Sequence, residues 1–185
     1  MNMKKESMIC QEKFKIRNIV STADLKQEIN IYKFNEYSWG RFDIVGNYNG
    51  KVGYVKDDSM DGRVTVFLSG KLISTGANSL LKSIFQLQRT HDLLKSHEFI
   101  KPVSISPKIQ NIVATFDLKK YVDFREVIIK KKKVIYEPEQ FPGMIYKTTC
   151  GTTCLVFASG KVVIVGSKSE EQIIDTIKEL VTLND

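Results

Sequence analysis

The sequence has few of the residues that build metal centres and disulfide frameworks. It contains three cysteines and two histidines among 185 residues. An odd number of cysteines argues against a disulfide scaffold and favours a reducing compartment. Cys150 and Cys154 lie four residues apart, but neither histidine is close to them in the sequence. A zinc site needs more ligands than these two, so the sequence predicts no metal and no other cofactor.

Long apolar runs and glycine-rich loops are missing as well. No apolar segment approaches the roughly 20 residues that a helix needs to span a bilayer. The first 14 residues are mainly polar instead of forming the apolar stretch of a secretory signal. Because no phosphate-binding loop or catalytic motif is present, we expect a protein that is not an enzyme and binds neither a membrane nor a small-molecule substrate. A Cys–His nucleophile pair stays open as an alternative, although no motif supports it.

The charge balance is moderately positive. There are 28 Lys and Arg residues against 21 Asp and Glu residues, a formal charge of +7. The hydrophobic content of 42% is that of a globular protein. A basic balance is compatible with nucleic-acid binding but does not establish it.

The most informative feature is an internal duplication. The segment 16–25, Ile-Arg-Asn-Ile-Val-Ser-Thr-Ala-Asp-Leu, recurs 93 residues later as Ile-Gln-Asn-Ile-Val-Ala-Thr-Phe-Asp-Leu at 109–118. The segment 66–71, Val-Phe-Leu-Ser-Gly-Lys, recurs 90 residues later as Val-Phe-Ala-Ser-Gly-Lys at 156–161. Two matching blocks in the same order predict a duplicated unit of about 90 residues.

The region between these blocks is harder to align. Tyr37 and Phe42 match Tyr136 and Phe141 with an offset of 99 residues. This alignment makes the first copy six residues shorter before its tyrosine and nine residues longer between its two phenylalanines. We therefore expect the loop after Phe42 to differ between the copies.

Each copy shows the same order of predicted elements. A β-branched strand opens it, a helix and several short strands follow, and a long amphipathic helix closes it. The predicted strands span 15–22 and 108–115, the predicted helices 78–95, 121–130 and 169–183, and the linker 101–107. Turn-forming pairs separate the short strands: Asn49-Gly50, Asp61-Gly62, Ser69-Gly70, Pro142-Gly143, Cys150-Gly151 and Ser159-Gly160. This order predicts an antiparallel sheet covered on one face by helices, an α+β fold.

The second face of this sheet needs an explanation. Strands such as 64–67 and 161–165 place apolar or hydroxyl residues on both faces, whereas a strand with one solvated face alternates apolar and polar residues. A large exposed apolar face usually marks a binding surface. The same pattern arises where a partner domain or a dimer covers the sheet, so both interpretations stay open.

Two long motifs carry a family resemblance. The segments 136–147, Tyr-Glu-Pro-Glu-Gln-Phe-Pro-Gly-Met-Ile-Tyr-Lys, and 155–163, Leu-Val-Phe-Ala-Ser-Gly-Lys-Val-Val, resemble the second repeat of the TATA-box-binding proteins. Both Asn-Ile-Val blocks and the first-copy Phe-Leu-Ser-Gly-Lys, with Thr-Gly-Ala behind it, are similar to the family as well. The resemblance covers about residues 14–183 and is weaker in the first repeat. The short N-terminal arm resembles archaeal members more than nuclear ones.

The resemblance implies a saddle-shaped α+β fold. After an arm at 1–13, two pseudo-symmetric repeats at 14–100 and 101–185 would form one curved ten-stranded antiparallel sheet with four helices on its convex face. The concave face would lie in the minor groove of DNA and bend it, a mode of binding for which this family is itself the standard example.

The resemblance assigns base contacts to both repeats. The apolar floor would comprise Val20, Ile73, Val113, Leu155 and Val163, with Thr22, Thr75, Thr115 and Val165 beside it. Minor-groove edges of A·T pairs offer acceptors and no guanine amino group, so a largely apolar surface fits them. Val165 stands where Thr75 has a hydroxyl, which removes one hydrogen bond from the second repeat.

Asn18 and Asn111 occupy the same place in the two copies. Their amides would donate hydrogen bonds to adenine N3 or thymine O2 at the central base steps. The alternative is an asparagine bonded only to local backbone.

Four phenylalanines match those that the family wedges between base steps: Phe42, Phe67, Phe141 and Phe157. The alternative is that they are core residues. Phe141 is followed by Pro142 and Gly143, whereas Phe42 is followed by Asp43 and so lacks the Phe-Pro-Gly motif. We therefore expect the first repeat to grip DNA differently.

Basic and acidic residues complete the predicted site. Lys71, Lys147 and Lys161, with Ser69 and Ser159, match phosphate contacts, which position a protein without reading sequence. The lysine run 130–133 is either a solvated helix end or an extra contact with DNA or polymerase factors. Glu137 and Glu139 match the family's docking site for transcription factor B, a solvated loop being the alternative.

The sequence therefore predicts a transcription initiation factor that binds and bends TATA-like promoter DNA and recruits transcription factor B and RNA polymerase. It would act in an archaeal nucleoid, or in a nucleus if the source is eukaryotic. Two alternatives stay open. One is a paralogue with weakened TATA preference that works through protein contacts. The other is a nucleic-acid-processing enzyme with a related fold, which would need a cluster of carboxylates on the concave face.

Overall fold

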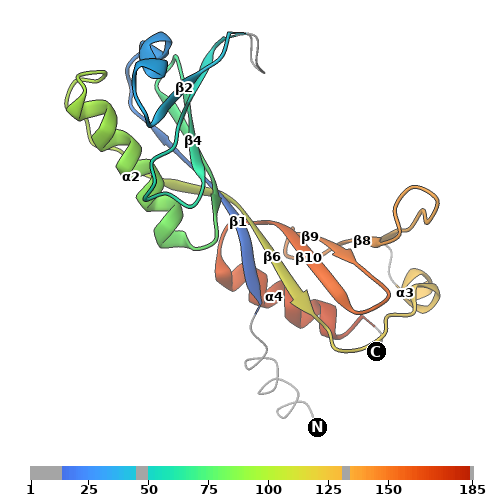
Figure 1. The fold of residues 1–185 in the computed structure, drawn as a ribbon. Helices are drawn as coiled ribbons and strands as arrows, with labels where there is room; N and C mark the ends of the chain where they lie inside the picture. Colours follow the sequence, from blue (N-terminus) through green and yellow to red (C-terminus); the bar gives the residue numbers. More distant parts are fainter. Residues whose placement is uncertain (1–13, 45–49, 131–133, 184–185) are drawn as a thin grey trace. The chain divides into compact units, whose positions relative to one another are not determined.

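The computed structural model describes residues 14–44, 50–130 and 134–183. Figure 1 shows the elements. In chain order they are β1 (Lys15–Asp24), the 3-10 helix η1 (Ile31–Glu36), β2 (Gly40–Phe42), β3 (Val52–Val55), β4 (Arg63–Phe67), β5 (Lys71–Ala77), α2 (Leu80–Ser96), β6 (Lys108–Asp117), α3 (Phe124–Lys130), β7 (Val134–Ile135), β8 (Met144–Lys147), β9 (Thr153–Val156), β10 (Lys161–Ser167) and α4 (Glu170–Val181).

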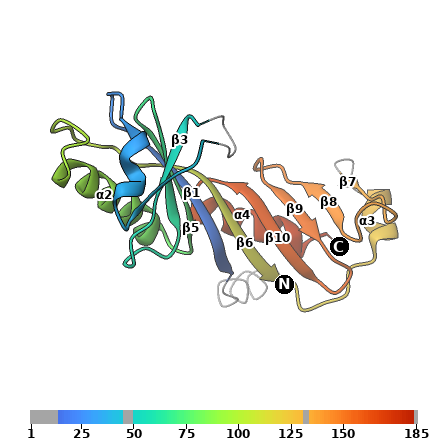
Figure 2. The same cartoon turned by 45° about the horizontal axis from the view of Figure 1, so that its top comes forward.

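The ten strands belong to one sheet in the order β2-β3-β4-β5-β1-β6-β10-β9-β8-β7. The pairings within each half are antiparallel, so the predicted α+β class is confirmed. The chain divides into two compact units. The first unit is Asn18–Gln110, and the second runs from Asn111 onward and includes β1 up to Arg17. Figure 2 shows β6, β10, β9 and β8 side by side in the second unit.

The predicted elements are present with shifted ends. β1 and β6 continue two residues beyond the predicted strands, to Asp24 and Asp117. The predicted helix at 121–130 begins at Phe124. The first repeat has no α-helix directly after Asp24, because the helical segment there is η1, a short 3-10 helix that begins at Ile31.

The two long helices begin at equivalent serine caps. Ser79 Oγ accepts a hydrogen bond from the backbone N–H of Lys82 at 3.3 Å. Ser169 Oγ accepts one from the backbone N–H of Gln172 at 3.2 Å. Each cap satisfies one of the free N–H groups in the first turn, which explains why both helices start at the same point of the repeat.

Each long helix covers one face of its own half of the sheet. α2 packs against β4 and β5, and α4 packs against β10. Side chains alternate between the two faces of a strand, so Ile19, Ser21 and Ala23 of β1 are buried while the residues between them are partly exposed. The alternating positions that are not buried under a helix form what we call the partly exposed face of each unit.

Buried polar groups also tie α2 to the sheet. The Gln86 side chain donates to Ser74 Oγ at 2.6 Å and accepts from the backbone N–H of Gly62 at 2.7 Å. Ser21 Oγ and Ser83 Oγ lie 2.7 Å apart. Because each polar group has a partner, their burial costs little, and the helix is held in one register against β5.

Strand pairing shows which residues of the two repeats are equivalent. Thr65 lies opposite Ile73, and Leu155 lies opposite Val163, which reproduces the 90-residue offset of the sequence blocks. On the next strand, Tyr54 faces Thr65 as Ile145 faces Leu155, an offset of 91 (145 minus 54).

The predicted alignment of Tyr37 with Tyr136 is wrong. Arg41 pairs with Tyr54, and Ile135 pairs with Ile145, so β2 and β7 match at an offset of 94 (135 minus 41). The β2–β3 loop has nine residues and the β7–β8 loop has eight. The two repeats are therefore nearly equal in length, and the expected nine-residue excess does not exist.

Two predicted features lie at the limits of the described residues. The lysine run 130–133 lies outside them except for the backbone of Lys130, and Asn49 of one predicted turn also lies outside them. In the described part of the chain, no helix is long and apolar enough to cross a membrane.

Candidate nucleic-acid interface

None of the predicted contact residues is buried, and all except Phe42 gather on the partly exposed face of each unit. Phe42 packs against the hydrophobic core of the first unit, opposite the buried Gly53. The partly exposed ones are Asn18, Val20, Thr22, Phe42, Phe67, Ile73 and Thr75 in the first repeat and Asn111, Val113, Thr115, Phe141, Leu155, Phe157, Val163 and Val165 in the second. The fully exposed ones are Ser69, Lys71, Pro142, Lys147, Ser159 and Lys161. Apolar side chains such as Val20 and Val113, which would normally be buried in a core, are therefore accessible to a ligand in both units.

The two asparagines are held in the same way in both units. Asn18 Oδ1 accepts a hydrogen bond from the backbone N–H of Gly76 at 2.8 Å, and Asn111 Oδ1 accepts one from Gly166 at 2.8 Å. Because an N–H donates, the bonded atom must be the amide oxygen. The glycines have φ values of +88° and +87°, which residues with a side chain rarely adopt. The backbone bond therefore leaves each Nδ2 as a donor on the partly exposed face.

Two long polar side chains that the sequence reasoning missed lie on the same face. Arg17 Nε donates to Thr115 Oγ1 at 2.9 Å in the second unit, and Gln110 Nε2 donates to Thr22 Oγ1 at 2.8 Å in the first. Arg17 and Gln110 are separated by 93 residues, so the duplication offset could have identified them as a pair. They bind the hydroxyls of the two predicted threonines, Thr115 and Thr22. Of this pair only Arg17, in the second unit, carries a positive charge.

The second repeat brings two predicted phenylalanines together. The rings of Phe141 and Phe157 meet edge to face with centroids 5.8 Å apart. Phe157 also lines a hollow of about 690 Å³ together with Lys15, Arg17, Thr115, Phe116, Asp117, Lys119, Ser159, Lys161, Val162 and Val163. The ring of Phe157 thus lines an open depression whose other lining residues are mostly basic and polar, a position that suits contact with a ligand better than core packing.

The first repeat has an equivalent hollow beside Phe67. It measures about 530 Å³ and is lined by Thr22, Ala23, Asp24, Lys26, Phe67, Lys71, Leu72, Ile73, Ser104, Ser106 and Lys108. Several of these residues match the lining of the second hollow at the offsets of 90 and 93. The pseudo-symmetry of the sequence thus extends to the shape of the surface.

Phe42 does not occupy the place of Phe141. Phe42 lies within β2, opposite Gly53, whereas Phe141 lies in the loop three residues before β8 begins. By strand register the equivalent of Phe141 is Gly50, at the offset of 91. The predicted equivalence of the two phenylalanines is therefore wrong, and the Phe42 contact with DNA stays a prediction.

The ring of Phe42 nevertheless reaches toward the equivalent position. Its Cζ lies 3.8 Å from the place where a Cβ on Gly50 would stand. The side chain of Asn35 fixes its backbone, because Asn35 Oδ1 accepts from Phe42 N and Asn35 Nδ2 donates to Phe42 O, both at 2.8 Å. Tyr32 packs edge to face against the ring at a centroid distance of 5.0 Å. An aromatic ring is thus supplied to this region from a different strand.

A further lysine joins the predicted basic residues. Lys56 directly follows β3 and matches Lys147 at the offset of 91 found for Tyr54 and Ile145, and both lysines are exposed. Sequence reasoning missed it because the wrong alignment around Phe42 hid the match. Each unit therefore has an exposed lysine at this position besides Lys71 or Lys161.

Two carboxylates that the sequence reasoning did not place lie at the ends of β1 and β6. Asp24 accepts hydrogen bonds from Lys26 Nζ at 2.9 Å and from Lys26 N at 2.8 Å. Asp117 accepts from Lys119 N at 2.9 Å and from Lys119 Nζ at 3.1 Å. These bonds lower the pKa of both carboxyl groups. Asp24 and Asp117 lie in different units, and the described residues contain no group of three or more His, Cys, Asp or Glu side chains suited to a metal.

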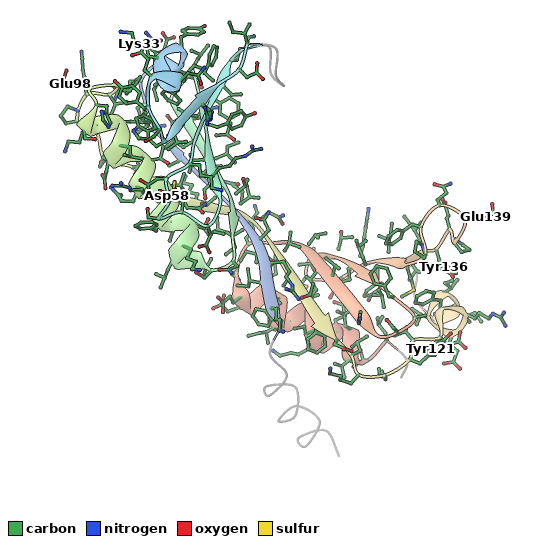
Figure 3. The ribbon with its side chains drawn as sticks, viewed as in Figure 1. Lys33, Asp58, Glu98, Tyr121, Tyr136 and Glu139 are labelled. Atoms are coloured by element: carbon green, nitrogen blue, oxygen red, sulfur yellow. The ribbon has the colours of Figure 1, made fainter. Side chains whose placement is uncertain are left out.

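The predicted partner residues lie on the loop between β7 and β8. Glu137 and Glu139 are exposed, and Figure 3 shows Glu139 on this loop beyond Tyr136. The backbone carbonyl of Glu137 accepts from the N–H groups of Gln140 and Phe141 at 3.0 and 2.9 Å. The loop that carries the two carboxylates is thus held to the backbone of Phe141.

Neither Cys150 nor Cys154, the two cysteines among the described residues, has a histidine beside it in its own unit. Cys154 is buried, and burial raises the pKa of its thiol to about 12. Cys150 Sγ lies among hydroxyls, 3.2 Å from both Thr148 Oγ1 and Thr176 Oγ1. Both histidines belong to the first unit and both of these cysteines to the second, so neither unit by itself contains the Cys–His pair that the sequence left open as an alternative.

The chain is similar to known transcription factors over most of its length. A family model described as "Transcription factor TFIID (or TATA-binding protein, TBP)" matches residues 13–97 and 106–183. A TATA-box-binding protein of Cenarchaeum symbiosum is 38% identical over 168 residues, which cover 91% of this chain and 92% of the relative. One of Aeropyrum pernix is 36% identical over 171 residues, 90% of this chain and 81% of the relative.

A solved structure matches as well. The Methanococcus jannaschii TBP superimposes with a TM-score of 0.81 at 27% identity, covering 93% of this chain and 98% of that one. The predicted fold class, two repeats that build a ten-stranded antiparallel sheet with helices, is confirmed by this match.

Proposed function

Because the chain belongs to the TATA-box-binding protein family, we propose that it is a general transcription initiation factor that binds TATA-like promoter DNA through the minor groove and bends it. The family consists of transcription factors, and no step of this function requires catalysis or a cofactor. The observation that carries the proposal is the pair of Asn18 and Asn111, which are held identically in the two units with their Nδ2 donors on the partly exposed face.

Recognition follows from the chemistry of this face. The minor groove of A·T pairs presents adenine N3 and thymine O2, which are acceptors. The two Nδ2 groups donate to such acceptors, and the side chains of Val20, Val113 and Val163 contact the base edges between them. Guanine would place an amino group against the carbon surface, where it loses its hydrogen bonds to water. The face therefore selects A·T pairs mainly by penalising guanine.

Bending follows from the phenylalanines at the edge of each hollow. A ring of Phe157 or Phe67 that enters a base step unstacks it at a cost of a few kcal/mol, which added contact area offsets. Phe141, packed edge to face on Phe157, supports the second-repeat wedge. Phe42 packs against the core of the first unit and is held by Asn35 in β2, so any part it takes comes from a different backbone position and the two wedges differ.

The exposed lysines supply the sequence-independent part of the affinity. Lys71, Lys147, Lys161 and Lys56 bind phosphates, helped by the hydroxyls of Ser69 and Ser159. Each phosphate neutralised contributes about 0.9 to the slope of log affinity against log salt concentration. Sequence specificity then comes from the apolar floor residues and the two asparagines, whereas the lysines supply the electrostatic attraction to the phosphates.

The bound complex recruits the next factors. Glu137 and Glu139 are exposed on the β7–β8 loop, and carboxylates beside a DNA-binding edge suit a basic protein surface. We assign this loop to transcription factor B, which then brings RNA polymerase to the promoter. The protein acts where promoter DNA lies, in the nucleoid of an archaeal cell.

A gel-shift series tests the function. The purified protein is titrated at low salt into a duplex with a TATA-like core and into a scrambled duplex rich in G·C, each with and without transcription factor B. We expect preference for the TATA-like duplex and a further shift with transcription factor B that is lost in the double variant Glu137→Gln/Glu139→Gln. Equal binding to both duplexes contradicts the proposal and favours the paralogue that works through protein contacts.

A further inference from the structure

Each of the two hollows contains one carboxylate beside its phenylalanine. Asp24 lines the hollow of the first unit with Phe67, and Asp117 lines the hollow of the second unit with Phe157. The other charged residues that line the hollows are all basic: Lys26, Lys71 and Lys108 in the first, and Lys15, Arg17, Lys119 and Lys161 in the second. A carboxylate repels DNA phosphates, so its presence at the same place in both hollows needs an explanation that holds for both units.

Strand register places each carboxylate against a predicted phosphate ligand. Asp24 on β1 pairs with Lys71 on β5, and Asp117 on β6 pairs with Lys161 on β10. Residues directly opposite each other on antiparallel strands have Cβ atoms about 4.5–5.5 Å apart, and opposite charges at such positions attract. Each carboxylate therefore partly neutralises the lysine across the strand pair.

A second lysine is bonded to each carboxylate. Asp24 accepts hydrogen bonds from Lys26 Nζ at 2.9 Å and from Lys26 N at 2.8 Å, and Asp117 accepts the same two bonds from Lys119. These bonds, and more weakly the charges of the lysines across the strand pairs, lower the pKa of both carboxyl groups. Both carboxylates are therefore ionised at neutral pH.

The turn that makes these bonds is unusual and is duplicated. Lys26 and Lys119 have φ values of +56° and +54°, a region that residues other than glycine seldom occupy. The backbone bond to the aspartate turns each lysine back onto the carboxylate two residues before it. Backbone strain of this kind persists where the surrounding structure imposes it, and such sites are often functional.

An ion pair inside the protein competes with DNA for the lysine. A lysine that neutralises a DNA phosphate releases condensed counterions, and this release drives much of the binding. A lysine already neutralised by its own carboxylate has to give up that pair first. DNA that enters either hollow therefore exchanges a carboxylate for a phosphate, which gains less than binding to an unpaired lysine.

We infer that Asp24 and Asp117 are internal counter-ions that take, in the free protein, the place of a DNA phosphate at Lys26 and Lys119, and so limit the sequence-independent affinity of both units. This inference rests on the proposed function and adds two residues that weaken DNA binding. Because every duplex offers the same phosphates, the carboxylates reduce the fraction of the protein that is held on DNA without a promoter.

The variant Asp24→Asn/Asp117→Asn tests this in the full-length protein. Asparagine Oδ1 can still accept the backbone N–H of the lysine two residues later, so the turn is kept, but the amide carries no charge. Affinity for the TATA-like duplex and for the scrambled duplex is measured by fluorescence anisotropy over a series of salt concentrations. Asp175→Asn is the matched control, because Asp175 Oδ1 pairs with Lys178 Nζ at 2.8 Å on α4 and lines neither hollow.

Removing the carboxylates should strengthen binding. Each single variant should bind both duplexes about two- to fivefold more tightly at low salt, the range expected for an exposed ion pair. The two effects should multiply because the residues lie in different units. The slope of log affinity against log salt concentration should steepen by about 0.9 per carboxylate removed and by about 1.8 in the double variant. The control should change neither the affinity nor the slope.

Other outcomes overturn the inference. Weaker or unchanged binding by the double variant does so, as does tighter binding with an unchanged salt slope or an equal gain in Asp175→Asn. Adding Lys26→Gln and Lys119→Gln to the double variant should remove the gain, and a gain that remains contradicts the assignment to these two lysines. Thermal unfolding checks that each variant is folded.

The proposed function fails in a different way. A wild-type protein that binds the TATA-like and scrambled duplexes equally contradicts that function. The comparison between the wild type and the asparagine variants still decides about the counter-ions, because both duplexes carry the same phosphates.

Discussion

Asn111→Asp separates the two roles of one side chain. Asn111 Oδ1 accepts the backbone N–H of Gly166 at 2.8 Å, and an aspartate oxygen keeps that acceptor in place. The second oxygen of aspartate, however, stands where Nδ2 donates to a base edge. Asn111→Ala removes both groups. The two variants should therefore rank in opposite order for stability and for DNA binding.

The magnitudes follow from the hydrogen bonds. Losing the Gly166 bond in Asn111→Ala costs about 0.5–1.5 kcal/mol of unfolding free energy, and Asn111→Asp costs less. At the DNA, alanine loses one hydrogen bond and leaves a base acceptor unpaired, about 1–2 kcal/mol. Aspartate also buries an unpaired acceptor of its own, so the loss rises to about 2–4 kcal/mol. At about 1.4 kcal/mol per factor of ten, aspartate should weaken binding by roughly 30- to 700-fold.

The assay combines anisotropy titrations on an A·T duplex at pH 8 with urea unfolding. Asn18→Asp should behave like Asn111→Asp. Asn30→Asp is the matched charge control, because Asn30 Oδ1 caps η1 by accepting from Tyr32 N at 3.2 Å and aspartate keeps that cap. If Asn111→Asp binds DNA as well as Asn111→Ala does, the amides do not donate to base edges and the recognition scheme is refuted.

Three further outcomes are expected. Phe157→Ala should reduce DNA bending, measured by energy transfer between dyes at the duplex ends, while the protein stays folded; unchanged bending would remove the wedge assignment. Arg89, whose Nη2 lies 2.7 Å from Asp57 Oδ2, lowers the pKa of Asp57 from 3.8 to about 2 by hydrogen bonding. Stability from this pair is therefore full above about pH 5 and lost as the pH falls toward 2. Asp57→Asn should thus cost about 1–2 kcal/mol in urea unfolding at pH 7 and about a third of that at pH 2.5, where the folded-state carboxyl is still partly ionised. An equal cost at both pH values would contradict this. Gly62→Ala puts a Cβ 1.9 Å from the carbonyl oxygen of Thr75. The urea midpoint of this variant should therefore fall by the equivalent of about 1–3 kcal/mol. An unchanged midpoint would show that the backbone moves to relieve the contact at no cost.

The parts of the fold that could be predicted from the sequence are those set by burial. The alternation in β1 and the helical period of α2 and α4 reflect which side chains are buried, and burial imposes these periods directly. Asn18 and Asn111 could be predicted because the strand that carries them is duplicated with little change. Their bonds to Gly76 and Gly166 could not, since those partners lie more than 50 residues away.

The region around β2 could not be predicted because tertiary packing decides its register. Gly40 begins β2 against η1, where a Cβ would lie 2.3 Å from the carbonyl oxygen of Phe34. Phe34 in turn packs against Trp39 with ring centroids 5.7 Å apart. These contacts place β2 three residues after Tyr37, whereas Tyr136 directly follows β7. Matching the two tyrosines therefore gave the wrong offset and hid the equivalence of Lys56 and Lys147.

The central claim is that this surface reads the minor groove, and base analogues test it most directly. Replacing adenine by 2,6-diaminopurine adds an amino group to the minor groove and leaves the major-groove groups of the A·T pair in place. Replacing every A·T pair by inosine·C keeps the minor-groove groups and changes those of the major groove. We expect the inosine duplex to bind within about threefold of the A·T duplex and the diaminopurine duplex to bind roughly tenfold or more weakly. The reverse order would show that the major groove is read and would contradict the account.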